Sequence, residues 1–219
     1  QTTESPDNIQ QVEVAGIKLK NKSKKIAIIS IIAILICIIA IFGIKYINDI
    51  KAKQAHKAAY NEYIDYLEES QFLMLDGGAD AESLCNLTIN VWHNSIYEER
   101  DTKTDPYTRK NGYWVSDFNE ALTNLYTDSS TKNTISNIES NQTMVKDLIK
   151  KMQNPPEGLE NCYTTVSDLY SAYKTLTDLA INPSGSYSSF SSNKSTTVSD
   201  FMSAYDKLDN QIPEKLSAE

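Results

Sequence analysis

Residues 26–42 read IAIISIIAILICIIAIF and contain Ser30 as their only conventionally polar side chain. With Gly43 and Ile44 the apolar stretch forms an α-helix about 28 Å long, which is close to the hydrocarbon thickness of a bilayer. Backbone amides in lipid must be satisfied within the segment, so a lone span of this kind has to be helical. We therefore predict one transmembrane helix over residues 26–44.

Two other interpretations of this stretch fit the sequence less well. A cleaved signal peptide has a shorter apolar region and small residues at the cleavage site, whereas residues 42–45 read FGIK. A lipoprotein signal would use Cys37, but Ile36 precedes it and apolar sequence continues after it. We interpret the stretch as an uncleaved signal anchor, in which Cys37 is a small apolar side chain facing lipid.

The lysines beside the span predict its orientation. Five lysines lie between residues 18 and 25 with no acid among them, and four more are spread over residues 45–57. Positively charged residues close to a span stay on the cytoplasmic side. We therefore expect a short cytoplasmic tail over residues 1–25, disordered because it is polar and aperiodic, with the large domain outside the membrane.

The charge of the remaining chain limits its partners. Residues 1–58 carry a net charge of +5, whereas residues 59–219 carry −13. Phosphate contacts need clustered Lys and Arg, so the acidic domain is predicted not to bind nucleic acid. The heavy use of Ile, Lys, Asn and Ser is typical of an AT-rich bacterial genome.

The first part of the domain is predicted to be two helices. No proline or glycine interrupts residues 45–75, so the span helix should continue as an exposed stalk over 45–59 and then enter the domain, which occupies residues 60–219. We expect Asp76-Gly77-Gly78 to end this helix and a second helix to occupy residues 79–100.

Residues 101–153 are predicted to hold a loop and further helix. Asn111-Gly112 is a hairpin-turn signal, and Ser116 is a suitable N-cap for the next helix. The apolar stripe that follows is interrupted over residues 127–134. It indicates either two helices or one long helix over 117–153; we favour one bent helix, since no Gly or Pro breaks it.

The last part of the chain has the clearest helical pattern. Seven residues recur at alternating spacings of three and four, as in a coiled-coil seam: Leu159, Cys162, Val166, Leu169, Tyr173, Leu176 and Ala180. Residues 184–197 are rich in Ser and are expected to be a flexible connection to a last helix over 197–211. The predicted fold is all-α, with the transmembrane helix running into an elongated antiparallel bundle of four to five helices.

Cys85 and Cys162 both lie on apolar stripes of predicted core helices. An exported domain permits a disulfide between them, and closure of so long a loop would stabilise the fold by about 4 kcal/mol. Two buried thiols are the simpler interpretation. Sequence alone does not establish whether the two Cβ atoms approach closely enough to form a bridge.

Aromatic residues in the two longer loops are the candidate interaction residues. They are Tyr107, Tyr113, Trp114, Tyr187 and Phe190. Exposed aromatic side chains on loops favour recognition of a partner protein. The alternative is that they pack onto the ends of the bundle, and the sequence weighs the two equally.

The sequence contains no recognisable catalytic or metal-binding motif. The two histidines, His56 and His93, lack the ligand spacing of a metal site. The loop Asp101–Asp105 superficially resembles a calcium loop, but Lys103 takes a ligand position and Pro106 stands where glycine is required. We therefore predict no cofactor, no metal and no enzymatic activity.

The sequence supports three hypotheses about function. The leading one is a single-pass membrane protein that presents an acidic helical bundle outside the cytoplasm as an adaptor or scaffold for a partner protein. The second is a ligand-sensing module that signals through a partner, since a short tail holds no output domain. The third, an enzyme, lacks supporting motifs. The oligomeric state stays open, because the span has no G-x-x-x-G pattern.

Overall fold

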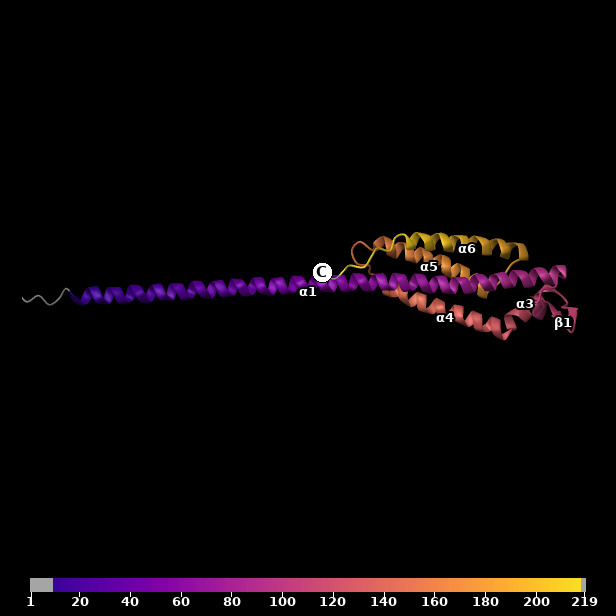
Figure 1. The fold of residues 1–219 in the computed structure, drawn as a ribbon, viewed down its shortest axis with the longest axis horizontal. Helices are drawn as coiled ribbons and strands as arrows, with labels where there is room; N and C mark the ends of the chain where they lie inside the picture. Colours follow the sequence, from indigo (N-terminus) through magenta and orange to yellow (C-terminus); the bar gives the residue numbers. More distant parts are fainter. Residues whose placement is uncertain (1–9, 218–219) are drawn as a thin grey trace, which may run out of the picture. The chain divides into compact units, whose positions relative to one another are not determined.

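The structure, a computed structural model, describes the backbone of residues 10–217 and the side chains of Ser30 and residues 32–217. The prediction of an all-α chain is confirmed (Figure 1). The elements are α1 (Gln10–Tyr97), α2 (Asp105–Thr108), β1 (Arg109–Lys110), β2 (Tyr113–Trp114), α3 (Phe118–Thr127), α4 (Ser129–Lys151), α5 (Glu160–Ile181) and α6 (Tyr187–Asp209).

The chain divides into two compact units. Unit 1 ends at His56 and unit 2 begins at Lys57. Helix α1 is the only helix in the described part that is long and apolar enough to cross a membrane, and its apolar stretch lies near the N-terminus. None of this stretch is buried: its large side chains are exposed from Ile32 to Phe42 and on to Ile47.

Helix α1 also extends further toward the N-terminus than the sequence indicated. Its backbone is helical from Gln10, whereas we expected a disordered tail over residues 1–25. Propagating a helix from an existing one costs far less than nucleating a new one, and the lysines of residues 18–25 are good helix formers. Residues 1–9 of the expected tail lie outside the described part of the chain.

Two adjacent glycines that we expected to end a helix lie inside α1 instead. Gly77 and Gly78 are buried, and the helix runs through them to Tyr97. A Cβ atom on Gly77 would lie 2.7 Å from Asn141 Oδ1, and one on Gly78 would lie 3.0 Å from the ring of Phe201. The glycines therefore serve close packing between helices, which a local stop signal does not reveal.

Hydrogen bonds and an ion pair join α4 and α6 to the part of α1 that lies in unit 2. Tyr63 donates its hydroxyl to the Met152 carbonyl on α4 at 3.0 Å, and Gln71 donates to Asp209 at the end of α6 at 3.1 Å. Further along α1, Glu82 pairs with Lys194 of α6 at 2.7 Å. Apolar side chains from all four helices form one core cluster.

The region 117–153 holds two helices rather than the single bent helix that we favoured. Asp128 adopts an extended backbone conformation, with φ −62° and ψ 144°, and its carboxylate accepts from the amides of Ser130 and Thr131. An aspartate N-cap starts α4 at this point without any glycine or proline. Asp117 caps α3 in the same way, while Ser116, the expected cap, donates to the carboxylate of Glu120.

The apolar seam predicted from Leu159 to Ala180 is confirmed. All seven of its residues, from Leu159 to Ala180, are buried. By contrast, α6 begins ten residues earlier than expected, at Tyr187, where Ser186 and Ser189 form a reciprocal capping box. The Ser-rich segment is therefore largely helical, and the burial of Phe190 explains how so weak a helix-forming sequence is held.

Candidate functional site

The predicted hairpin is present and forms one end of unit 2. Strands β1 and β2 pair antiparallel, with Arg109 opposite Trp114. Asn111 and Gly112 have positive φ angles of 53° and 86°, as a type I′ turn requires. The Arg109 guanidinium lies over the Trp114 ring at 5.4 Å and donates to the Gly112 carbonyl, so the hairpin is braced by its own side chains.

Buried hydrogen bonds attach this hairpin to the helices beside it. The Asn94 side chain of α1 donates to the hydroxyl of Thr104 at 2.9 Å, and Thr104 is fully buried. On the α3 side, Asn124 donates to the Tyr107 carbonyl at 3.0 Å. Asp105 lies 3.6 Å from Arg109. A two-stranded hairpin alone is marginal, and these contacts fix its position.

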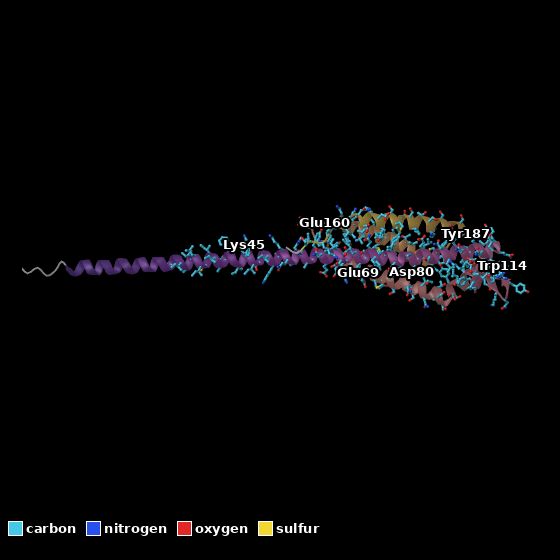
Figure 2. All side chains as sticks on the ribbon, viewed as in Figure 1. Lys45, Glu69, Asp80, Trp114, Glu160 and Tyr187 are labelled. Carbon is cyan, nitrogen blue, oxygen red and sulfur yellow. The ribbon has the colours of Figure 1, made fainter. Side chains whose placement is uncertain are left out.

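An aromatic cluster supports the same end of the unit from inside. Trp92 is nearly buried and stacks on Phe118, with ring centroids 5.9 Å apart. Its ring also lies 6.4 Å from that of Tyr187 and 6.0 Å from that of Phe190. We call the region formed by this cluster, the hairpin and the last turn of α1 the hairpin end; Figure 2 labels Trp114 and Tyr187 there.

The structure gathers the five candidate aromatic residues at the hairpin end, but it exposes them unequally. Tyr113 is 78% exposed, whereas Trp114, Tyr107 and Tyr187 are half-buried. Phe190 is fully buried, so for this residue the structure agrees with the alternative that it packs onto the bundle. It packs inward because it occupies the first turn of α6 rather than a flexible connection.

Two exposed residues of the hairpin end were missed in the sequence. Ile96 and Tyr97 form the last turn of α1 and are 43% and 60% exposed. The helix ends there because Glu98 adopts a left-handed conformation, with φ 53°. The absence of any glycine at this position hid the end, which we had placed at Arg100.

A polar hollow of about 420 Å³ lies beside the exposed aromatic side chains. Its wall includes the imidazole of His93, whose Nδ1 is 3.1 Å from Asn94 Oδ1 and 3.8 Å from Glu99 Oε2. The rings of His93 and Tyr97 lie 4.6 Å apart. The remaining lining residues are Asn90, Arg100, Asp101 and Tyr187. The hollow thus offers carboxylate acceptors, a guanidinium donor and amide groups next to aromatic rings.

Cys85 on α1 and Cys162 on α5 are both free, buried thiols. Cys162 interacts electrostatically with Tyr63, whereas Cys85 is itself on α1, twenty-two positions further along. That spacing corresponds to about 33 Å of helix, far beyond the reach of a disulfide. The structure therefore does not bring the two together. Burial raises the pKa of the Cys85 thiol to about 12, which keeps it protonated.

The acidic loop after α1 uses its carboxylates within the fold. Asp101 accepts from the Lys103 amide at 3.1 Å, and Asp105 lies 3.4 Å from the Arg100 guanidinium. Over the described residues, no three side chains of His, Cys, Asp or Glu are gathered to hold a metal ion. His56 lies on α1 in unit 1.

Comparison with known proteins gives no family assignment. No family model matches the chain, and neither the curated proteins nor the solved structures contain a match.

Proposed function

We propose that this chain is a single-pass membrane protein that presents an acidic helical bundle outside the cytoplasm for binding to a partner protein. Residues 26–44 span the membrane, residues 1–25 stay in the cytoplasm, and residues 60–219 form an antiparallel bundle. Contacts along α1 support the antiparallel bundle, because later residues of α4 and α6 meet earlier residues of α1: Asn141 lies at Gly77 and Met152 at Tyr63, while Lys194 lies at Glu82 and Asp209 at Gln71.

The exposed apolar side chains of α1 support the membrane anchor. From Ile32 to Phe42 every large apolar side chain is at least 42% exposed, and Ile44 and Ile47 continue the run. An apolar surface that surrounds a helix on all sides needs a covering that is itself apolar, and lipid provides it. The lysine-rich segment before the span supports the orientation.

Tyr113 carries the proposal of a protein interface at the hairpin end. Its ring is 78% exposed, yet it sits on a hairpin that is braced by Arg109 and Trp114. An exposed aromatic ring on a rigid base loses little conformational freedom on binding. Tyr, Trp and Arg are the residues that most often dominate interface energetics, and all three occur here.

Labelling of engineered cysteines in intact cells tests the orientation. We expect a membrane-impermeant maleimide to label Ser188→Cys, at an exposed position of α6, without permeabilisation. The matched control, Ser23→Cys, precedes the span and should be labelled only in permeabilised cells. The reverse pattern would place the bundle in the cytoplasm and overturn the proposal.

Site-specific photo-crosslinking tests the interface. A photoreactive residue at Tyr113 should yield a discrete protein adduct in intact cells, while the same residue at Thr164, an exposed position on α5, should not. Tyr97→Ala should weaken the adduct formed from position 113. Equal adducts from positions 113 and 164 would mean that the hairpin end is not a selective interface.

The polar hollow favours a second candidate function, the sensing of a small polar ligand. Its mixture of amide, carboxylate and guanidinium groups beside His93 fits a hydrogen-bonding solute. A ligand that binds only the folded state raises the melting temperature, and the rise grows with the logarithm of the ligand concentration above the Kd. We expect such a shift for the full chain in detergent with one member of a panel of polar metabolites, and its loss in His93→Ala. No shift across the panel would leave protein binding as the function.

A further inference from the structure

The chain after α6 continues in the direction of that helix and lies along α1 as far as Lys57, without helix or strand (Figure 1). The side chain of Asn61 pairs with both backbone groups of Leu216. It accepts from the Leu216 amide at 2.8 Å and donates to the Leu216 carbonyl at 3.1 Å. Lys57 donates to the Ser217 carbonyl. The Asn61 side-chain amide thus pairs with both backbone groups of one residue, as a residue of a neighbouring strand would.

Two carboxylates of α1 recognise a side chain of the same segment. Lys215 Nζ lies 2.6 Å from Asp65 Oδ1 and 2.9 Å from Glu68 Oε2. With Asn61, these residues lie about one turn apart along a single face of the helix. The face therefore selects for an extended backbone and for a cation at one position of it.

The charge of α1 favours a cationic occupant over this whole region. Between Ala58 and Tyr97 the helix carries seven acidic residues and no Lys or Arg. Lys215 offsets the charge of Asp65 and Glu68, but Glu214 beside it adds another negative charge. A segment with more positive charge than residues 213–217 would complement this face better.

We propose that the face of α1 from Lys57 to Glu68 is a docking site for an extended segment of a partner protein, with a basic residue followed by an apolar one. Residues 213–217 occupy this site in cis, and the partner segment displaces them. The site is separate from the hairpin end and does not depend on the proposed function.

The contacts of residues 213–217 are of a kind that a competitor can replace. The side chains of Lys215, Asp65 and Glu68 are 42%, 61% and 54% exposed, and exposed ion pairs contribute little because water and salt screen them. Attachment to α6 compensates, since a short flexible connection gives a local concentration on the order of millimolar. A free partner segment therefore has to overcome the high local concentration of residues 213–217 more than the strength of their individual contacts.

Peptide binding to two forms of the full chain in detergent tests this proposal. The double variant Lys215→Glu/Leu216→Pro vacates the site, because it adds a carboxylate beside Asp65 and removes the amide that donates to Asn61. The probe is a fluorescent peptide of sequence QIPEKLS, residues 211–217. We expect saturable binding to the vacated chain at millimolar peptide or below, at least about tenfold tighter than to the unaltered chain.

Matched controls identify the residues that carry the binding. Adding Asn61→Ala to the vacated chain should weaken binding about tenfold, since two hydrogen bonds are lost. The peptide QIPKKLS should bind tighter than QIPEKLS, and QIPEELS should not bind. Equal affinity for the vacated and unaltered chains, no saturable binding, or indifference to Asn61→Ala would each overturn the proposal.

A second measurement uses the unaltered chain, so it does not depend on how the variants fold. Saturating QIPKKLS should displace residues 213–217 and remove the hydrogen-exchange protection of the Leu216 amide. The amide of Leu169, in the core of α5, serves as the control and should stay protected. Retained protection at Leu216 under saturating peptide would contradict displacement.

Discussion

Gly77 on α1 lies so close to Tyr173 on α5 that a Cβ atom at position 77 would be 2.7 Å from the phenolic oxygen. The same atom would be 2.7 Å from Asn141 Oδ1 on α4, which accepts the Tyr173 hydroxyl at 2.6 Å. Three helices therefore meet at a buried hydrogen bond that only a bare backbone leaves room for.

Gly77→Ala is expected to destabilise unit 2 although alanine is the better helix former. Alanine gains about 1 kcal/mol in helix propensity. Overpacking against the Tyr173–Asn141 hydrogen bond costs about 1–3 kcal/mol and also disturbs that bond. We expect a net loss of about 1–2 kcal/mol in the free energy of unfolding, measured by chemical denaturation with circular dichroism.

Gly78→Ala is the matched control for this prediction. Its Cβ would contact the Phe201 ring at 3.0 Å, and a side chain yields more easily than a buried hydrogen-bonded pair. We expect a smaller loss than for Gly77→Ala. A larger loss would mean that the Tyr173–Asn141 contact is not what restricts α1.

Tyr173→Phe should destabilise the fold and also reduce the effect of Gly77→Ala. Loss of the hydroxyl leaves the buried Asn141 oxygen without its donor, at a cost of about 1–2 kcal/mol. The phenylalanine ring has no oxygen near position 77, so one of the two close contacts disappears. A double-mutant cycle should show a loss smaller than the sum of the two single losses. Strict additivity would contradict the shared contact.

Phe190→Ala and Tyr113→Ala should separate the packing and the recognition roles of the loop aromatic residues. Phe190 is fully buried against Trp92, and its truncation should cost about 3–5 kcal/mol in unfolding free energy. Tyr113 is exposed, so its truncation should change stability by less than about 0.5 kcal/mol. Only Tyr113→Ala should abolish co-purification of the partner protein while leaving the melting temperature unchanged.

Asp128 should give the start of α4 a defined pH dependence. Hydrogen bonds from the Ser130 side chain and backbone hold the pKa of this carboxyl below its ordinary value of 3.8. A lowered folded-state pKa means that the stabilisation is fully present above pH 3.8 and is lost as pH falls through the lowered pKa.

The measurement is the melting temperature of Asp128→Ala against that of the unaltered chain. The variant should melt lower at neutral pH, and below pH 3.8 the difference should narrow to the gap that the uncharged cap of Asp128→Asn leaves. Asp128→Asn retains a capping oxygen without a charge and should lie between the two. A gap that persists undiminished at low pH would show that charge plays no part in the cap.

Helical periodicity predicted most of the fold because it reports burial directly. The spacing from Leu159 to Ala180 identified a face that is buried throughout, and Asn111-Gly112 identified the hairpin through its backbone requirement. These features depend on neighbours along the chain. For that reason one sequence is enough to find them.

The errors arise where a distant contact decides the role of a residue. Gly77 and Gly78 have the local signature of a helix end, and only Asn141 and Phe201 give them another role. In the sequence Phe190 has the surroundings of a loop residue, and its contact with the Trp92 ring is visible only in the fold. In the candidate site, the same limit hid Tyr97 and left the role of Phe190 undecided, since the exposure of a side chain depends on which helix packs against it.

Trypsin has no cleavage site in α1 beyond Lys57, because no Lys or Arg lies between Lys57 and Arg100. The next cleavage sites follow in the loop after α1 and in the hairpin, at Arg100, Lys103, Arg109 and Lys110. Complete digestion will therefore release residues 58–100, which include the part of α1 that packs in the bundle, as one peptide. That fragment provides a single mass-spectrometric reporter for crosslinks and labels placed anywhere along it.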